Sequence, residues 1–375
     1  MTTHSEPLMQ LLRDEVAANS GVISFERFME LALYHPEGGY YQAKSFSIGK
    51  SGDFTTASEL SPLYAHCFAN QCQQIANNEP YDILELGAGT GRFACDLLQK
   101  LSYLPDHYYI HEISEALINQ QRDMIATHAP DLLSRVIWLK TLPENLNGII
   151  IANEVLDALP VTRFRISENQ IEERGVAFKD DQFIFSNMPS LLPDLLTRVS
   201  ELQQKYNLPV GYESEINFKL SPFIHALSRA LTRGVILLAD YGYGEAEYYH
   251  PERNRGTLNC FYQHQSHANP LILPGKQDIT AHVDFTQVAI SALDAGCQLS
   301  GYTTQTGFLL NCGLDKLIET AEKGLSNVEL FHLHQAIKRL TLPQEMGERV
   351  KIMALSKKMD TPLCGFKTHD RRRDL

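Results

Sequence analysis

From residue 81 onward, short apolar runs alternate with amphipathic stretches, a pattern that predicts strands followed by helices. Five apolar runs, each bounded by turn residues, are typical of buried parallel strands: 81–86, 108–112, 136–139, 148–154 and 234–242. Stretches with helical periodicity lie between them, as crossover connections between parallel strands require. The pattern therefore predicts an α/β fold built on a central parallel sheet.

The first 80 residues predict a helical N-terminal extension. Ser24 is placed to cap a helix whose apolar face begins at Phe25, and Pro62 is placed to open a second helix. Between these helices, residues 37–41 and 49–59 combine turn formers, hydroxyl groups and aromatics. That mixture favours a packed binding loop over a solvated linker.

The second predicted domain, residues 81–375, carries two interruptions of the strand and helix pattern. Residues 161–220 predict an insertion made of a strand pair and an amphipathic helix. Residues 241–283 show little periodicity, and their aromatics and glycines favour an ordered lid. Asp284 then caps a helix, and strand-like segments follow at 302–310 and 350–356. The Arg-rich tail at 370–375 is expected to fray.

The turn after the first strand suits a nucleotide cofactor. It consists of Gly87, Ala88, Gly89, Thr90 and Gly91. Glycines at alternate positions permit positive φ and keep Cβ atoms away from a ligand. A dinucleotide site expects G-x-G-x-x-G, whereas the spacing here is G-x-G-x-G, preceded by Glu85. A carboxylate suits a cationic amino-acid end better than a pyrophosphate. Glu112, 21 residues after Gly91, is placed to accept hydrogen bonds from ribose hydroxyls.

Composition narrows the class of partner. A formal charge of −12 argues against nucleic acid but allows a basic protein partner. Seven cysteines without a C-x-x-C pair indicate neither a disulfide framework nor a zinc ribbon, which favours a reducing compartment. No apolar run reaches the length of a membrane span, and residues 1–7 lack the features of a secretory signal or a transit peptide. The sequence thus predicts a cytoplasmic protein.

Seven separate blocks give the chain a family resemblance. They lie at 33–41, 52–57, 85–91, 153–160, 240–242, 255–258 and 278–285. Together they resemble the MidA family of class I S-adenosylmethionine-dependent methyltransferases, which is related to the mitochondrial complex I assembly factor that methylates arginine. The resemblance implies a Rossmann-like seven-stranded sheet, S-adenosylmethionine as cofactor, and a protein substrate bearing arginine, such as a complex I-type subunit. It also implies that Asp53, Phe54 and Thr55 close over the cofactor beside the glycine turn.

The end of the fourth strand holds the candidate acceptor residues, because open α/β sheets bind ligands at the carboxyl ends of their strands. Asn153 is expected beside the cofactor. Glu154 is the first candidate to hold a guanidinium group through paired hydrogen bonds, and Asp157 is the second. A charge at a helix N-terminus is an equally good explanation for Asp157.

Three further residues are candidates on weaker grounds. Trp138, the only tryptophan, either lines an adenine pocket or packs in the core. Tyr241, at the end of the fifth strand, and His282, in the lid, are candidate substrate contacts. Although Asp278, His282 and Asp284 are close in sequence, their spacing is no metal-ligand signature, and displacement of methyl from a sulfonium needs no metal. We therefore expect no metal site.

Two alternatives to a protein arginine methyltransferase remain open at this point. A chain that binds the cofactor without turnover would be an assembly or adaptor protein for a respiratory complex. The same chemistry also allows a small-molecule acceptor. A nicotinamide-dependent oxidoreductase is disfavoured by the glycine spacing. The motifs thus identify the methyl donor, while the acceptor depends on the resemblance alone.

Overall fold

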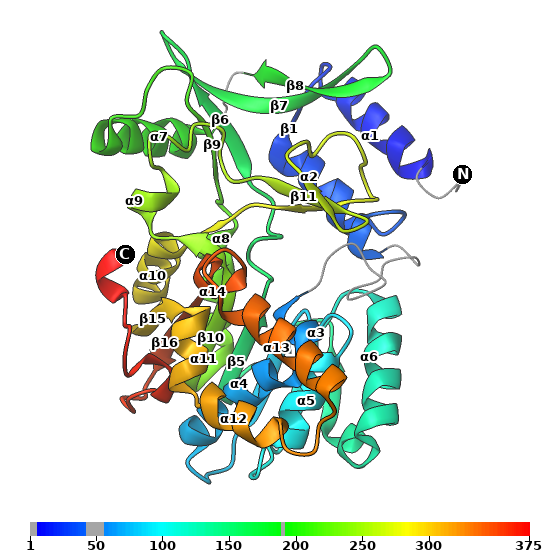
Figure 1. Cartoon of the computed structure of the whole chain (residues 1–375). Helices are drawn as coiled ribbons and strands as arrows, with labels where there is room; N and C mark the ends of the chain where they lie inside the picture. Colours follow the sequence, from blue (N-terminus) through cyan, green and yellow to red (C-terminus); the bar gives the residue numbers. More distant parts are fainter. Residues whose placement is uncertain (1–5, 43–55, 189–191) are drawn as a thin grey trace.

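The computed structural model describes residues 6–42, 56–188 and 192–375, and a large sheet forms its main body (Figure 1). The strands follow the order β15-β16-β10-β5-β2-β3-β4. Their bounds are β2 Asp82–Leu86, β3 Tyr108–His111, β4 Val136–Leu139, β5 Leu146–Asn153, β10 Leu231–Tyr243, β15 Gln298–Thr304 and β16 Val350–Lys357. Only β16 is antiparallel to its neighbours β10 and β15. This order confirms the predicted Rossmann-like seven-stranded sheet, to which the short β14 (Val283–Asp284) adds a further pairing with β10.

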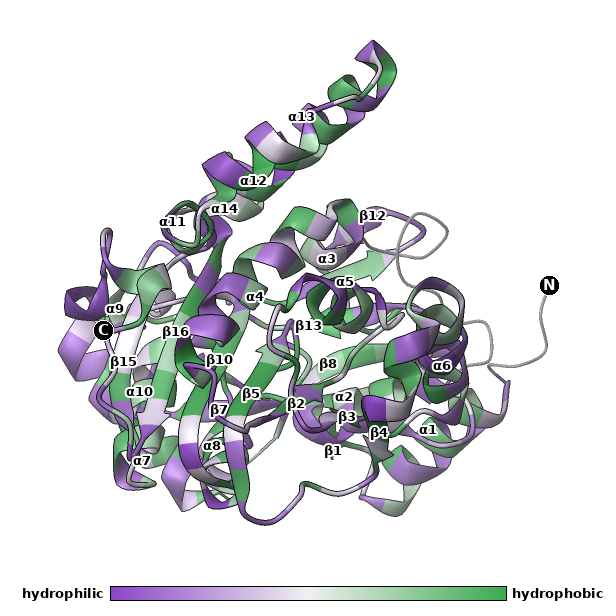
Figure 2. Ribbon diagram, turned by 90° about the horizontal axis from the view of Figure 1, so that it is seen from below, coloured by the Kyte–Doolittle hydropathy of each residue, from purple (hydrophilic) through white to green (hydrophobic). Residues whose placement is uncertain are grey.

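The parallel strands are mostly apolar because helices cover both faces of the sheet. In β5, Ile149 and Ile151 face one layer of helices, while Ile150 and Ala152 face the other. The first layer comprises α4 (Pro62–Ala76), α5 (Arg92–Lys100), α6 (Glu115–His128), α11 (Gln305–Asn311) and α14 (Met346–Arg349). Helices α12 (Leu314–Ala321) and α13 (Asn327–Thr341) pack against helices of this layer. The second layer comprises α8 (Leu220–Ala230) and α10 (Phe285–Asp294). Figure 2 shows α12 and α13 projecting away from this body. Among the described residues, no helix is long and apolar enough to cross a membrane.

A second sheet combines the insertion with the N-terminus. Its strands are β1 (Ile23–Ser24), β7 (Ile171–Lys179), β6 (Thr162–Ile166) and β9 (Glu213–Ile216), with β8 (Gln182–Met188) paired to β7. Helices α1 (Glu6–Ala18) and α2 (Phe25–Tyr34) pack on this sheet, as does α7 (Pro193–Tyr206). The predicted 1–80 extension is therefore divided in space. Its first two helices join the insertion, whereas α3 (Ala57–Leu60) and α4 join the main body.

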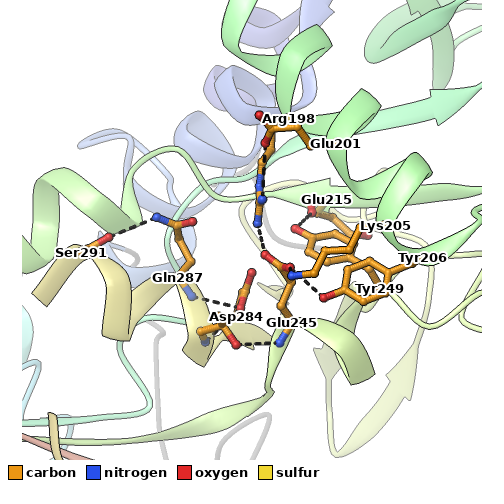
Figure 3. Close-up of polar contacts among 11 residues, drawn as sticks. Arg198, Glu201, Lys205, Tyr206, Glu215, Glu245, Tyr249, Asp284, Gln287 and Ser291 are labelled. Carbon is orange, nitrogen blue, oxygen red and sulfur yellow. Dashed lines mark hydrogen bonds and ion pairs between the residues drawn. The ribbon is translucent and has the colours of Figure 1, made fainter. Parts of the chain in front are cut away.

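The predicted lid contains more regular structure than its sequence pattern indicates. It holds α9 (Glu245–Tyr248) and a small sheet of β11 (Asn259–Tyr262), β12 (Gln265–His267) and β13 (Asp278–Thr280). An ion-pair cluster joins α9 to α7 (Figure 3). Glu245 pairs with Arg198 and accepts hydrogen bonds from Lys205 Nζ at 2.6 Å and the Tyr206 hydroxyl at 2.8 Å. Burial acts to raise the pKa of Glu245, but the bonds from Lys205 and Arg198 outweigh it and lower that pKa.

Other predicted segments also differ from the structure. The strand expected at 302–310 ends at Thr304, because the Thr304 hydroxyl accepts a hydrogen bond from Gly307 N and starts α11. The tail expected to fray is instead packed on the main body. Arg371 N donates to the Tyr302 carbonyl at 2.7 Å, and Leu375 packs against the core. The helix capped by Ser24 is confirmed.

Candidate active site

A pocket of about 470 Å³ opens at the carboxyl ends of β2, β3 and β5. Residues from α3 and the tyrosines Tyr34 and Tyr41 line its side. Seven predicted site residues are in its lining: Glu85, Gly87, Ala88, Gly89, Glu112, Asn153 and Glu154. Other predicted residues lie within the described part of the chain but outside this lining: Gly91, Trp138, Asp157, Tyr241 and His282. Asp53, Phe54 and Thr55 lie outside the described residues.

The glycine turn has the backbone geometry that its sequence predicts. Gly87, Gly89 and Gly91 have φ values of 59°, 53° and 84°, which L side chains rarely adopt. Gly91 precedes α5, and a Cβ atom added to it would lie 3.0 Å from Gln121 Cα on α6. The turn therefore combines an exposed backbone at the pocket with close packing behind it.

Glu85 lies one residue before the end of β2, in the pocket wall, and is only 2% exposed. The Tyr108 hydroxyl on the neighbouring strand donates to Glu85 Oε2 at 2.8 Å. Burial raises the pKa of Glu85 to about 8, and the bond from Tyr108 partly opposes this shift. A buried carboxyl group that faces a pocket fits a positively charged ligand group, because a cation restores its ionisation.

Glu112 follows β3 and is held by three donors. Its Oε1 accepts from Ile113 N at 2.8 Å and from Ser114 N at 2.9 Å, while Oε2 accepts from Gln121 Nε2 at 3.2 Å. Burial raises the pKa of Glu112, and these hydrogen bonds oppose the shift. A carboxylate oriented in this way at the pocket surface is suited to accept hydrogen bonds from hydroxyl groups.

Glu154 is also in the lining, directly after β5. It has a φ of 53°, a left-handed conformation that is uncommon for a residue with a side chain and is concentrated at functional sites. Its Oε1 accepts a hydrogen bond from Ala57 N of α3 at 3.4 Å. Burial, together with repulsion from Asp240 and Asp278, raises the pKa of Glu154 to about 8. Beside it, Asn153 Oδ1 accepts from the Tyr64 hydroxyl at 2.6 Å.

Three further carboxyl groups are buried behind Glu154: Asp157, Asp240 and Asp278. Asp240 Oδ2 accepts hydrogen bonds from the backbone of Val155 at 3.1 Å and Leu156 at 2.8 Å, so it fixes the turn that follows Glu154. Burial, and then repulsion from Asp240 and Asp278, raises the pKa of Asp157 well above its ordinary value. This part of the site therefore combines one carboxyl group in the lining with buried carboxyl groups whose charges repel it.

Tyr241 and His282 lie together, but away from the pocket lining. Their ring centroids are 6.2 Å apart, and His282 stacks on Tyr243 at 5.2 Å. His282 N donates to Thr257 Oγ1 at 3.0 Å. Burial lowers the pKa of His282 to about 4, which leaves the ring neutral at pH 7. These contacts give His282 a role in organising the lid.

The pocket also contains residues that sequence reasoning did not select. Tyr34 and Tyr41 stack with centroids 5.5 Å apart, and their hydroxyls donate to the Ala158 carbonyl and to Asp278 Oδ1, each at 2.8 Å. Thr90 Oγ1 donates to Glu59 Oε1 at 2.5 Å and ties the glycine turn to α3. Tyr34 and Tyr41 belong to the block at 33–41, which is the only sequence signal that could have identified them.

Comparison with known proteins gives relatives of similar length. The chain is 26% identical to human protein arginine methyltransferase NDUFAF7, mitochondrial, over 93% of this chain and 83% of the relative. It is 24% identical to the zebrafish protein of that name, over 94% and 87%. These relatives are mitochondrial proteins, as is the Caenorhabditis elegans homologue. The expectation of a cytoplasmic location is therefore wrong by this comparison. That expectation rested mainly on the lack of a recognisable targeting segment in residues 1–7.

Solved structures and a family model identify the cofactor. The structure of a "likely methyl transferase" from Burkholderia thailandensis, bound to S-adenosyl-homocysteine, is 36% identical to this chain, with a TM-score of 0.93 over 99% of this chain and 97% of that one. A native structure from the same organism gives a TM-score of 0.91 at 36% identity. A family model described as "Putative S-adenosyl-L-methionine-dependent methyltransferase" matches residues 63–303. The chain belongs to this family of methyltransferases, and S-adenosylmethionine is its cofactor.

Proposed function

We propose that this methyltransferase modifies an arginine side chain of a protein substrate. The observation that carries the proposal is the group of carboxyls at and behind the end of β5. Glu154 is in the lining, and Asp157, Asp240 and Asp278 are buried near enough to raise its pKa or that of each other. Because several like-charged groups are costly to bury together, this part of the pocket favours a cationic acceptor over a neutral one.

Within this proposal, Glu154 is the candidate for the main chemical requirement of methylating arginine, a nucleophilic nitrogen. The cofactor supplies an electrophilic methyl group, and the acceptor nitrogen must offer a lone pair. Deprotonating a free guanidinium at pH 7 costs roughly 7–9 kcal/mol, from a pKa of about 12.5–13.8 and about 1.36 kcal/mol per unit. Glu154 would accept hydrogen bonds from guanidinium N–H groups and so keep positive charge on the nitrogens that are not methylated.

The remaining carboxyls act on Glu154 rather than on the acceptor. Asp240 holds the backbone after Glu154, and Asp240 and Asp278 add the negative potential that helps to raise its pKa. Tyr34 and Tyr41 supply aromatic surface in the same lining, which suits the planar face of a guanidinium. The names of the relatives, protein arginine methyltransferases at 24–26% identity, support the same acceptor class.

Glu154→Gln tests the proposal. We expect at least about 100-fold slower methyl transfer, as for loss of a charged catalytic contact, with little change in S-adenosylhomocysteine affinity. Radiolabelled cofactor would be incubated with enzyme and a cell lysate, and the labelled proteins hydrolysed for amino-acid analysis. Glu144→Gln, an exposed carboxylate between β4 and β5, is the matched control.

The labelled product decides between acceptors. Label recovered in methylarginine, and lost only in Glu154→Gln, supports the proposal. Label in another amino acid or in a small molecule contradicts it. Intact cofactor binding with no transfer of label by the wild type would also contradict it and would favour a non-catalytic assembly role.

A further inference from the structure

Gln121 occupies a position on α6 where an apolar side chain is expected. Leu117, Ile118 and Ile125 share the buried face of the helix, and Gln121 is itself fully buried. Burying an amide group is costly unless its hydrogen-bonding atoms are paired. Its contacts lead directly to the cofactor pocket.

The amide of Gln121 connects three segments of the chain. Its Nε2 donates to the Gly89 carbonyl oxygen at 3.0 Å and to Glu112 Oε2 at 3.2 Å. Its Oε1 accepts from Trp138 Nε1 at 2.9 Å. Because the indole N–H can only donate, it requires the amide oxygen on its side and directs both amide hydrogens to Gly89 and Glu112. Both of these residues line the pocket, whereas Gln121 and Trp138 lie behind it.

We propose that Gln121 is a positioning residue, oriented by Trp138, that holds Glu112 and the glycine turn in the arrangement that recognises the ribose hydroxyls of the cofactor. The inference rests on the assignment of Glu112 to the ribose. Oε1 of Glu112 already accepts two backbone hydrogen bonds, so Oε2 keeps most of the free capacity. Gln121 occupies one side of Oε2 and restrains where the other side points.

Two neighbouring residues, Gly91 and Arg122, pack against Gln121 and Trp138. Gly91 allows close approach of α6, since a Cβ atom there would lie 3.0 Å from Gln121 Cα. The guanidinium of Arg122 lies 4.8 Å from the centre of the Trp138 ring and covers it from the same helix. Trp138 thereby has a role behind the pocket wall, in place of the adenine contact that its sequence position suggests.

Calorimetric titration with S-adenosylhomocysteine and with its 2′,3′-dideoxy analogue tests the inference. The wild type should prefer the natural ligand by about 10- to 100-fold, the effect of one hydrogen bond to a charged group. Gln121→Met should lose most of this preference, because the substitution should weaken the binding of S-adenosylhomocysteine and leave the binding of the dideoxy analogue unchanged. Trp138→Phe, which removes only the indole N–H, should lose part of it. Gln120→Met, at a half-buried position next in the chain, is the control and should retain it.

The ratio of the affinities for S-adenosylhomocysteine and its dideoxy analogue distinguishes a role in positioning Glu112 from a general effect on folding. An unchanged ratio in Gln121→Met, or equal weakening of both ligands, would overturn the inference. If that variant does not fold, an unchanged ratio in Trp138→Phe would overturn it instead. A wild type that shows no preference would remove the assignment of Glu112 to the ribose, and the role of Gln121 with it. None of these results would affect the proposal that arginine is the acceptor.

Discussion

Glu85→Gln is expected to stabilise the cofactor-free protein while weakening its binding of cofactor. Burial raises the pKa of Glu85 from an ordinary value of 4.5 to about 8. Between these values the folded protein keeps a proton that the unfolded chain releases. The stability contributed by the neutral carboxyl is therefore complete below about pH 4.5 and falls as the pH rises towards 8. At pH 7.5, about three units above the unfolded pKa, the loss is on the order of 4 kcal/mol at 1.36 kcal/mol per unit.

Glutamine removes this pH dependence without removing the acceptor for Tyr108, because an amide oxygen replaces the carboxylate oxygen. In urea denaturation at pH 7.5, we expect the unfolding free energy of Glu85→Gln to exceed that of the wild type by roughly 2–4 kcal/mol. The two proteins should converge near pH 4.5. Affinity for S-adenosylhomocysteine, whose amino-acid end carries an ammonium group, should fall by about 10- to 100-fold in the variant.

Proton release gives an independent check on the same reasoning. At pH 7 the wild type should release close to one proton on binding S-adenosylhomocysteine, since the ammonium group restores the ionised form of Glu85. Calorimetry in two buffers with different ionisation enthalpies measures this number, and Glu85→Gln should reduce it. A variant that is less stable than the wild type at pH 7.5, or that binds and releases protons as the wild type does, would refute the reasoning.

Two further substitutions test how the site is supported. Asp240→Asn should lower the unfolding free energy by about 1–3 kcal/mol and also slow methyl transfer, because Asp240 Oδ2 accepts the backbone hydrogen bonds that fix the turn after Glu154. Normal turnover in a destabilised variant would argue against this link between the turn and methyl transfer. Ser24→Ala removes the hydroxyl that caps α2, at 3.1 Å from Arg27 N, and should cost about 1 kcal/mol in urea denaturation while leaving S-adenosylhomocysteine affinity unchanged.

The main body could be predicted from sequence because burial and capping leave local signals. The apolar run of β5 follows from helices on both faces, as Ile150 and Ile151 show by facing opposite layers. Ser24 and Asp284 act on backbone groups within a few residues, so their helices could be located from nearby sequence alone. Glu85 lies near the end of β2 and Glu112 directly follows β3. Both reach the pocket because the carboxyl ends of parallel strands share one edge of the sheet.

The features that were missed depend on contacts between segments far apart in the chain. The C-terminal tail is ordered because Arg371 meets Tyr302, and no pattern within residues 370–375 reveals that partner. The strands of the lid are short and paired with one another, so residues 241–283 carry little periodicity. Gln121 appears only as a polar interruption in an amphipathic helix, and its meaning comes from Trp138 and Glu112 on other elements.

Two carboxyl groups of the pocket share one electrostatic property. Glu85 and Glu154 both have pKa values raised to about 8, chiefly by burial. In the cofactor-free protein these groups are therefore largely neutral at pH 7, and a cation bound beside either of them lowers its pKa and so restores the carboxylate. A sulfonium donor carries one positive charge more than its thioether product, and buried carboxylates attract it correspondingly more. Carboxylates at these two positions thus favour binding of the methyl donor over binding of its product, although burying them reduces the stability of the cofactor-free protein.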